Sequence, residues 1–142
     1  MKRVIIAGSR GFRNYDILCK MCDALIGGGD VTIFSGGADG TDLLGEQYAA
    51  DRGYPIKKFP ADWGLHGKAA GPIRNRQMAE RADMLIAFWD GESPGTRNML
   101  RTAESLALDW HLIKYKEHHP PTPHKKKGYF KKDDTITPQK NG

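Results

Sequence analysis

The sequence predicts an α/β fold of the Rossmann-like type, a three-layer sandwich around a central parallel sheet of about five strands. Five short apolar segments alternate with segments of helical periodicity. Strict alternation of this kind implies parallel strands that are joined by right-handed helical crossovers. Several apolar segments are nearly continuous runs, which is typical of strands covered on both faces. The chain length of 142 residues favours a single domain.

The expected strands are rich in β-branched and apolar residues. They are residues 3–9, 31–35, 56–59, 84–89 and 111–115. The expected helices fall between them, at residues 15–26, 41–52, from 71 onward and 96–108. Asn14 suits the N-cap of the first helix, because its side chain can accept a hydrogen bond from the first turn. Pro72 suits the first turn of the third helix.

Charge divides the chain into two parts. Residues 1–115 hold 15 lysines and arginines against 14 acidic residues, whereas residues 116–142 hold seven lysines against three acidic residues. The later part is also rich in proline and poor in aliphatic residues, so it cannot bury enough apolar area to offset chain entropy. We therefore expect a nearly neutral domain over residues 1–115 and a disordered basic tail over 116–142.

The composition also argues against a membrane-spanning, secreted or disulfide-rich protein. No apolar run reaches the ~18 residues that a membrane helix needs, and Gly8 interrupts the apolar start too early for a secretory signal. Cys19 and Cys22 are too few for a disulfide framework and lie in the middle of a helix. We expect a cytoplasmic protein with no metal, no cofactor and no membrane contact. We expect no nucleic-acid partner beyond weak contacts through the lysines of the tail.

Three glycine-rich loops follow predicted strands, at residues 8–12, 35–42 and 90–96. The carboxyl ends of parallel strands share one sheet edge, where ligands bind in this class of fold. Two of the loops run directly into helices, whose N-termini suit a phosphate group. The loops match neither GxxxxGK[ST] nor GxGxxG. The sequence therefore predicts a ligand site that belongs neither to a P-loop nucleotidase nor to an ordinary NAD dehydrogenase.

The expected ligand-binding residues lie in these loops and in the segment that follows the third strand. They are Gly8, Ser9, Arg10, Gly36, Gly37, Gly40, Thr41, Asp42, Trp63, Arg74, Asn75, Ser93, Gly95 and Thr96. Arg74 is the strongest candidate, because an arginine in the first turn of a helix opposes the helix dipole and asks for an anionic partner. We expect Arg76 to face solvent, and Trp63 or Phe12 to lie against a base.

Several of these residues also have a structural explanation. Ser93 or Thr96 can cap the helix that begins there, and Asp42 can reflect the preference of acids for helix N-termini. Trp63 can serve loop packing. Glu46 lies one turn further into its helix, where the dipole argument fades, so acid–base chemistry is a candidate role for it.

Four motifs together resemble the SLOG superfamily, and within it the YspA-like, cpYpsA-related group. They are GSRGF at residues 8–12, SGGADGTDLLGEQYA at 35–49, DW at 62–63 with AGPIRNRQM at 70–78, and FWDGESPGT at 88–96. The resemblance covers roughly residues 2–110. It implies a Rossmann-like fold that binds nucleotides or nucleotide-derived ligands, in bacteria or bacteriophages.

More distant relatives implied by the resemblance are the DNA-processing protein A and the Lonely Guy phosphoribohydrolases, which cleave the bond between a base and ribose 5′-monophosphate. The Lonely Guy enzymes carry the motif PGGxGTxxE. Residues 93–96 are similar to its phosphate-binding half, whereas Met99 stands at the glutamate position. Glu46 would then have to supply the carboxylate, with Arg74 beside it.

Three hypotheses of function follow. The first is binding of a nucleotide or a nucleotide-derived, ADP-ribose-like ligand. The alternative is N-glycosidic hydrolysis of nucleoside 5′-monophosphates with Glu46 and Arg74 as catalytic residues, so whether the protein is an enzyme stays open. The third is DNA binding, against which the neutral body argues. The resemblance also leaves a homo-oligomer open.

Overall fold

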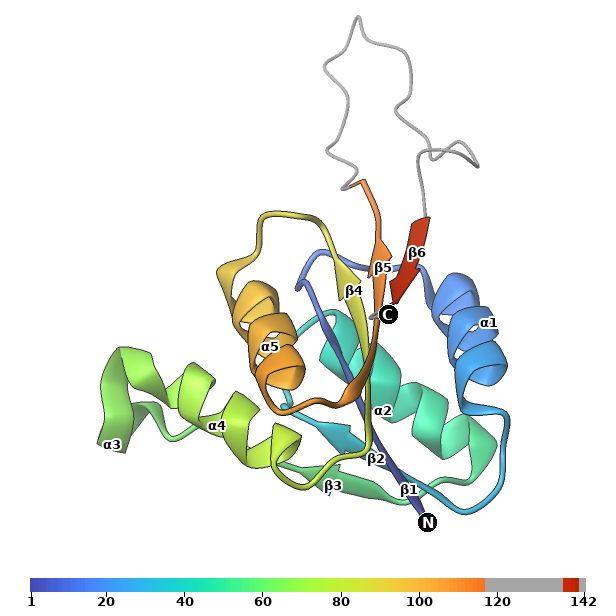
Figure 1. Cartoon of the computed structure of the whole chain (residues 1–142), viewed down its shortest axis with the longest axis horizontal. Coiled ribbons are helices and arrows are strands. Elements are labelled where there is room, and N and C mark those ends of the chain that lie inside the picture. The colour runs from blue at the N-terminus through green and yellow to red at the C-terminus, as the bar shows by residue number, and fades with distance from the viewer. Residues whose placement is uncertain (117–136, 141–142) are drawn as a thin grey trace, which may run out of the picture.

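A computed structural model describes residues 1–116 and 137–140 as an α/β sandwich (Figure 1). The sheet has the strand order β3-β2-β1-β4-β5-β6, and its first five strands are parallel. These are β1 (Lys2–Gly8), β2 (Val31–Ser35), β3 (Ile56–Lys58), β4 (Met84–Trp89) and β5 (Asp109–Lys114). The predicted fold class is therefore confirmed.

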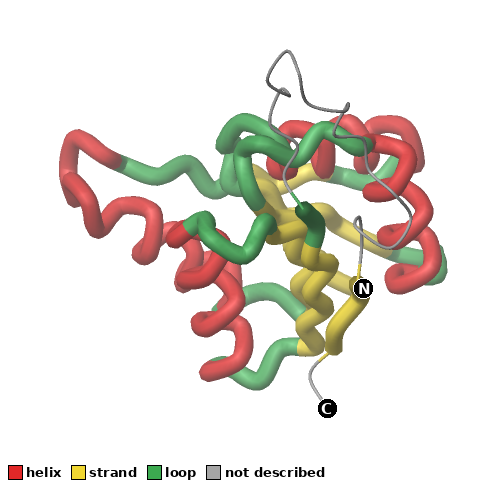
Figure 2. Tube along the Cα trace, turned by 90° about the horizontal axis from the view of Figure 1, so that it is seen from above, coloured by secondary structure: helices red, strands yellow, loops and turns green. Residues whose placement is uncertain are grey.

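Four long helices cover the sheet, two on each face (Figure 2). They are α1 (Tyr15–Ile26), α2 (Thr41–Arg52), α4 (Ala70–Ala79) and α5 (Pro94–Ser105). The Asn14 side chain accepts a hydrogen bond from the Ile17 N–H at 3.1 Å, as the capping argument predicts. Helix α5 begins two residues earlier than expected, because Pro94 takes the first-turn position that suits its fixed φ.

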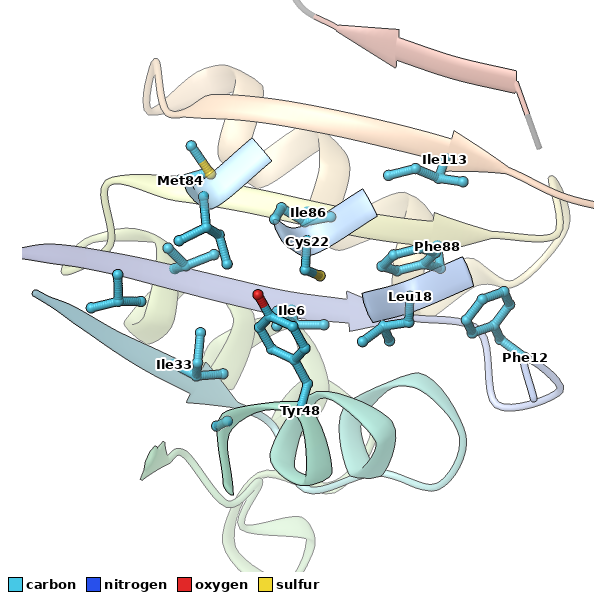
Figure 3. Close-up of a cluster of buried hydrophobic side chains, with 14 of the residues drawn as sticks. Ile6, Phe12, Leu18, Cys22, Ile33, Tyr48, Met84, Ile86, Phe88 and Ile113 are labelled. Carbon is cyan, nitrogen blue, oxygen red and sulfur yellow. The ribbon is translucent and has the colours of Figure 1, made fainter. Parts of the chain in front are cut away.

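The core consists of two clusters, one on each face of the sheet. Ile6 and Phe88 point to the face where Leu18 and Cys22 of α1 and Tyr48 of α2 pack (Figure 3). Ile5 and Leu85 point to the opposite face, against Met78 of α4 and Met99 of α5. Burial on both faces explains why β1 and β4 read as continuous apolar runs.

The segment between β3 and α4 contains a short helix, α3 (Trp63–His66), and a 3₁₀ turn, η1 (Gly67–Ala69). Neither element has a buried residue. In Figure 1 they lie at the outer end of α4, away from the sheet. Neither element is predicted from the sequence, because each is too short to show helical periodicity.

A sixth strand, β6 (Thr137–Lys140), pairs antiparallel with β5. The disordered tail expected over residues 116–142 did not include this strand, because Pro138 and Lys140 are poor strand formers. Both are tolerated at the edge of a sheet, where one side of the strand pairs with nothing. Residues 117–136 and 141–142 lie outside the described residues, and the division into a domain and a tail stays a prediction.

The order of the strands predicts where a ligand site lies in this sheet. The chain runs from β1 outward to β2 and β3 and then returns to β4 on the other side of β1. Strand order therefore reverses between β1 and β4, and in such sheets ligands bind outside the carboxyl ends of the strands at this point.

Candidate functional site

A cavity of about 690 Å³ lies at the carboxyl ends of β1 and β4, between the N-terminal parts of α2, α4 and α5. We call it the first lobe. Its polar and charged lining residues are Ser9, Arg10, Asp42, Trp63, Lys68, Arg74, Asn75, Asp90, Ser93, Thr96 and Asn98. A second cavity of about 450 Å³, the second lobe, shares Arg10, Ala38, Trp63 and Arg74 with the first. The two lobes are therefore adjacent and share a wall, and we treat them as one candidate site.

The N-terminus of α5 forms one wall of the first lobe. Pro94 has no N–H, and the N–H groups of Gly95 and Thr96 belong to the first turn, where no intrahelical partner exists. The Asp90 carboxylate holds the loop before the helix, accepting hydrogen bonds from the N–H groups of Glu92 and Ser93 and from Ser93 Oγ, each at 2.8 Å. Burial raises the pKa of Asp90, but these bonds outweigh burial and hold the pKa below its usual value.

Thr96 is buried at the floor of the same turn. Its exposed fraction is 5%, it lines the first lobe, and its hydroxyl makes no hydrogen bond with any described residue. The hydroxyl oxygen itself is not sealed off from solvent, so it is open to the first lobe. Together with the two helix N–H groups it offers donors that a ligand in the first lobe can use.

Ser9 and Thr41 connect the loops that surround the first lobe. Thr41 Oγ1 donates a hydrogen bond to the Ser9 carbonyl oxygen at 2.9 Å, and Ser9 Oγ accepts one from the Asp90 N–H at 3.1 Å. Gly8 must lack a side chain, since a Cβ there would lie 2.2 Å from the Phe88 carbonyl oxygen. The glycine and the two hydroxyls thus hold the ends of β1 and β4 and the start of α2 together.

Arg74 stands between the two lobes. Its Nη1 donates to the Gly36 carbonyl oxygen at 2.6 Å and its Nε to Asn75 Oδ1 at 3.0 Å. Asn75 in turn donates to Asn98 Oδ1 at 2.9 Å, which ties α4 to α5. Burial lowers the pKa of the Arg74 guanidinium while Asp42 raises it, and an arginine stays charged at physiological pH. Arg76 faces solvent, as predicted, and its Nε lies 3.2 Å from Glu80 Oε2.

Asp42 is a buried carboxyl group in the wall of the first lobe. Its Oδ2 accepts a hydrogen bond from the Ala38 N–H at 3.1 Å. Burial raises the pKa of Asp42 to about 6, against the opposing effects of that hydrogen bond and of the Arg74 charge. Asp42 can therefore take up or release a proton near neutral pH.

Two sequence comparisons identify the family. The model of the YspA, cpYpsA-related SLOG family matches residues 2–66. The Gene 61 protein of Mycobacterium phage D29 is 33% identical over 118 residues, which are 76% of this chain and 93% of the relative. The chain belongs to the YspA, cpYpsA-related SLOG family. The predicted resemblance is confirmed, and the phage relative fits the expected distribution.

Two solved structures have a fold similar to that of this chain. The X-ray structure of TM1055, a structural genomics target, has a TM-score of 0.58 and 20% identity, with 78% of this chain and 72% of that chain covered. DNA processing protein A from Streptococcus pneumoniae has a TM-score of 0.61 and 18% identity, with 77% of this chain covered. This chain spans about half of that protein, at 48%. At these identities the likeness concerns the fold.

The four SLOG motifs meet at the two lobes. The first lobe is lined by ten of the predicted site residues, namely Gly8, Ser9, Arg10, Asp42, Trp63, Arg74, Asn75, Ser93, Gly95 and Thr96. Gly36 and Gly37 line the second lobe. Gly40 and Thr41 line neither, because Gly40 packs against the backbone of Arg10 and Thr41 bonds to Ser9.

Glu46, the predicted catalytic carboxylate, also lines neither lobe. Its Oε2 accepts a hydrogen bond from Ser35 Oγ at 2.6 Å, and its Oε1 lies 3.6 Å from Lys58 Nζ. Phe12 is not available to a base either. It is buried in the core, with its ring centroid 4.8 Å from that of Phe88 (Figure 3).

Several residues that line the first lobe are not among the predicted site residues, for example Lys68, Asp90 and Asn98. Asp90 carried a signal, since an aspartate three residues before a serine at a helix start is typical of a side chain that holds a turn. Lys68 and Asn98 carried none, because only the tertiary packing of η1 and α5 brings them to the first lobe.

Among the described residues, no helix is long and apolar enough to cross a membrane. Within the same part of the chain, no three His, Cys, Asp or Glu side chains gather in a way that could hold a metal ion.

Proposed function

We propose that this SLOG protein binds a nucleotide or nucleotide-derived ligand, with one phosphate group of the ligand in the first lobe at the N-terminus of α5. The observation that carries the proposal is the hydroxyl of Thr96, which is open to the first lobe and has no hydrogen-bond partner among the described residues. A phosphate oxygen there would accept from this hydroxyl and from helix N–H groups, and the helix dipole would favour its charge.

The charges around the first lobe support an anionic ligand. Arg10, Lys68 and Arg74 line it, against Asp42 and Asp90. The Asp90 carboxylate is already satisfied by its own loop, so it is a weak competitor for a cation. Arg74 is held in place by Gly36 and Asn75, and a preorganised guanidinium binds phosphate well.

Trp63 is the side chain best suited to the base of such a ligand. Trp63 lines both lobes, and the residue is 55% exposed. An exposed indole beside a phosphate site offers a stacking surface that tolerates any base. Its location on α3, outside the core, leaves the ring accessible to a ligand that enters from solvent.

Isothermal titration calorimetry tests the proposal with AMP, GMP, CMP, UMP and ADP-ribose, each beside its phosphate-free nucleoside. We expect at least one nucleotide to bind and its nucleoside to bind at least about tenfold more weakly, because the phosphate makes the charge-assisted bonds. Arg74→Gln should lower the affinity to a similar degree, whereas Arg76→Gln, its matched control, should not. Equal binding of nucleoside and nucleotide, or no binding at all, would refute the proposal.

Hydrolysis of an N-glycosidic bond is a second candidate function, favoured by the position of Asp42. A carboxyl group in the first lobe with a pKa of about 6 is suited to acid–base chemistry on a bound ribosyl group. Release of free base from the four monophosphates, followed by chromatography, is the assay. Asp42→Asn should abolish turnover if Asp42 acts, whereas loss in Glu46→Gln alone would return the role to Glu46. If the wild-type protein releases no base, hydrolysis is refuted and ligand binding remains the proposed function.

A further inference from the structure

The second lobe carries positive charge that a single phosphate in the first lobe would not use. Its charged lining residues are Arg10, Lys58 and Arg74 against Asp39. Arg10 and Arg74 belong to both lobes, whereas Lys58 belongs to the second lobe alone. Lys58 is the last residue of β3, at the same sheet edge as the ends of β1 and β4.

A chain of polar contacts fixes the wall on which Lys58 stands. The Gly37 N–H donates to Ser35 Oγ at 3.1 Å, and that hydroxyl donates to Glu46 Oε2 at 2.6 Å. The other oxygen of Glu46 lies 3.6 Å from Lys58 Nζ. Glu46 thus acts as a positioning residue that connects Lys58 to the glycine loop of the second lobe.

The Lys58–Glu46 contact leaves the ammonium group available. The Lys58 side chain is 66% exposed and the Glu46 side chain is 16% exposed. An ion pair at 3.6 Å with one exposed partner is weak, so a phosphate dianion could compete for the lysine. Within the part of the chain that the structure describes, neither Arg10 nor Arg74 lies within ion-pair distance of a carboxylate, although the charges of both lower the pKa of Asp42.

We propose that the second lobe is a subsite for a second phosphate group, bound by Lys58 and Arg10 with Arg74 between the two lobes. The ligand would then carry two separated phosphate groups, one on each side of a nucleoside. The inference rests on the proposed function, which supplies the first phosphate at α5. A nucleoside 3′,5′-bisphosphate and a 5′-phosphorylated dinucleotide both have this chemistry.

The neighbouring lysine is a natural control. Lys57 precedes Lys58 on the same strand and carries the same charge, but it lines neither lobe. Its Nζ lies over the Phe59 ring, 5.6 Å from the centroid. Substitution of either lysine by glutamine removes the same formal charge, so only a local contact can make their effects differ.

The test is calorimetric titration of wild type, K58Q and K57Q with AMP, ADP, adenosine 3′,5′-bisphosphate and the dinucleotide pApA. We expect one or both of the last two ligands to bind wild type roughly tenfold more tightly than AMP. ADP, whose phosphates are adjacent, should not bind more tightly than AMP in a way that depends on Lys58. K58Q should remove most of this gain in affinity over AMP, while the affinity for AMP itself changes by less than about twofold. K57Q should keep the gain in affinity. Circular dichroism checks that both variants fold.

Each outcome bears on the proposal. A gain with pApA alone supports a dinucleotide ligand, and a gain with the bisphosphate alone supports a doubly phosphorylated nucleoside. The subsite is refuted if neither ligand exceeds AMP, if the gain persists in K58Q, or if K57Q weakens it equally. Binding of AMP that depends on Arg74, without any gain, would leave the proposed function intact. No binding of any nucleotide would overturn both.

Discussion

Arg74 donates a hydrogen bond from Nη1 to the carbonyl oxygen of Gly36 at 2.6 Å, across 38 positions of the chain. The bond joins α4 on one face of the sheet to the loop that leads into α2 on the other. The close fit leaves no room for a side chain at residue 36. A Cβ there would lie 2.4 Å from Arg74 Nη1 and 2.9 Å from Asp42 Oδ2.

Gly36→Ala is therefore expected to disturb binding more than folding. The added methyl group would push the Arg74 guanidinium away from both lobes, and the flexible end of that side chain can move at small cost. We expect nucleotide affinity to fall about tenfold, with a loss in the free energy of unfolding of about 1 kcal/mol. Calorimetry and urea denaturation measure the two quantities.

Gly64→Ala is the control for this substitution. The nearest atom to a Cβ at Gly64 is Asp62 Oδ1 at 3.7 Å, an ordinary contact. Neither affinity nor stability should fall in this variant. An unchanged affinity in Gly36→Ala would show that Arg74 does not depend on its bond to Gly36.

Local sequence patterns predicted the sheet and much of the site, because both depend on short-range signals. Apolar runs such as those of β1 and β4 identify buried strands without knowledge of their partners. Glycine loops that follow such strands must meet at one edge once the strands are parallel. These two local signals are enough to predict that Arg10, Asp42 and Thr96 lie close together, and all three line the first lobe.

The features that local patterns could not predict are those that only tertiary contacts determine. Asp42 and Glu46 are one helical turn apart and share a helix face, so the sequence could not separate them. In the structure, Asp42 reaches the first lobe, whereas Ser35 and Lys58 engage Glu46. Strand β6 depends in the same way on the open edge of β5.

Gly8→Ala should destabilise the protein itself. Gly8 ends β1, and a Cβ there would lie 2.2 Å from the Phe88 carbonyl oxygen of the paired strand β4, a backbone atom that cannot turn away. We expect a loss of about 3 kcal/mol in the free energy of unfolding, as for other overpacked sites.

Gly95→Ala provides the contrast to Gly8→Ala. No atom lies within 4 Å of its Cβ, so it should gain up to about 1 kcal/mol through helix propensity. Equal stability of the two variants would contradict the steric argument.

Asp42→Asn should stabilise the protein at neutral pH and not in acid. The pKa of Asp42 is about 6 in the folded protein and about 3.9 in an unfolded chain. Because the folded state binds this proton more tightly, the cost of the buried charge is absent below about pH 4 and complete above about pH 6. Removal of the charge should therefore add up to about 3 kcal/mol to the free energy of unfolding at pH 7.5, and little at pH 4.

Asp39→Asn is the matched control for Asp42→Asn, because Asp39 is an exposed acid in the loop just before α2. Urea denaturation at both pH values should show no comparable difference for it. The groups that face Asp42 are Ala38 N–H, Arg74, Glu46 and Arg10, and they are common to both variants. A gain for Asp42→Asn that is equal at pH 4 and pH 7.5 would exclude the buried charge as its cause.

Thr96→Val should separate ligand binding from folding at the floor of the first lobe. Valine has nearly the shape of threonine, and the hydroxyl that it removes has no partner among the described residues. The free energy of unfolding should therefore stay the same or rise slightly. Nucleotide affinity should fall about tenfold, the value of a hydrogen bond to a charged group, while nucleoside affinity stays constant.

Thr102→Val is the control, because Thr102 lies on the same helix but outside both lobes. It should change neither the free energy of unfolding nor the nucleotide affinity. If Thr96→Val weakened nucleoside and nucleotide alike, the hydroxyl would not contact the phosphate, and the ligand would have to bind elsewhere in the lobe.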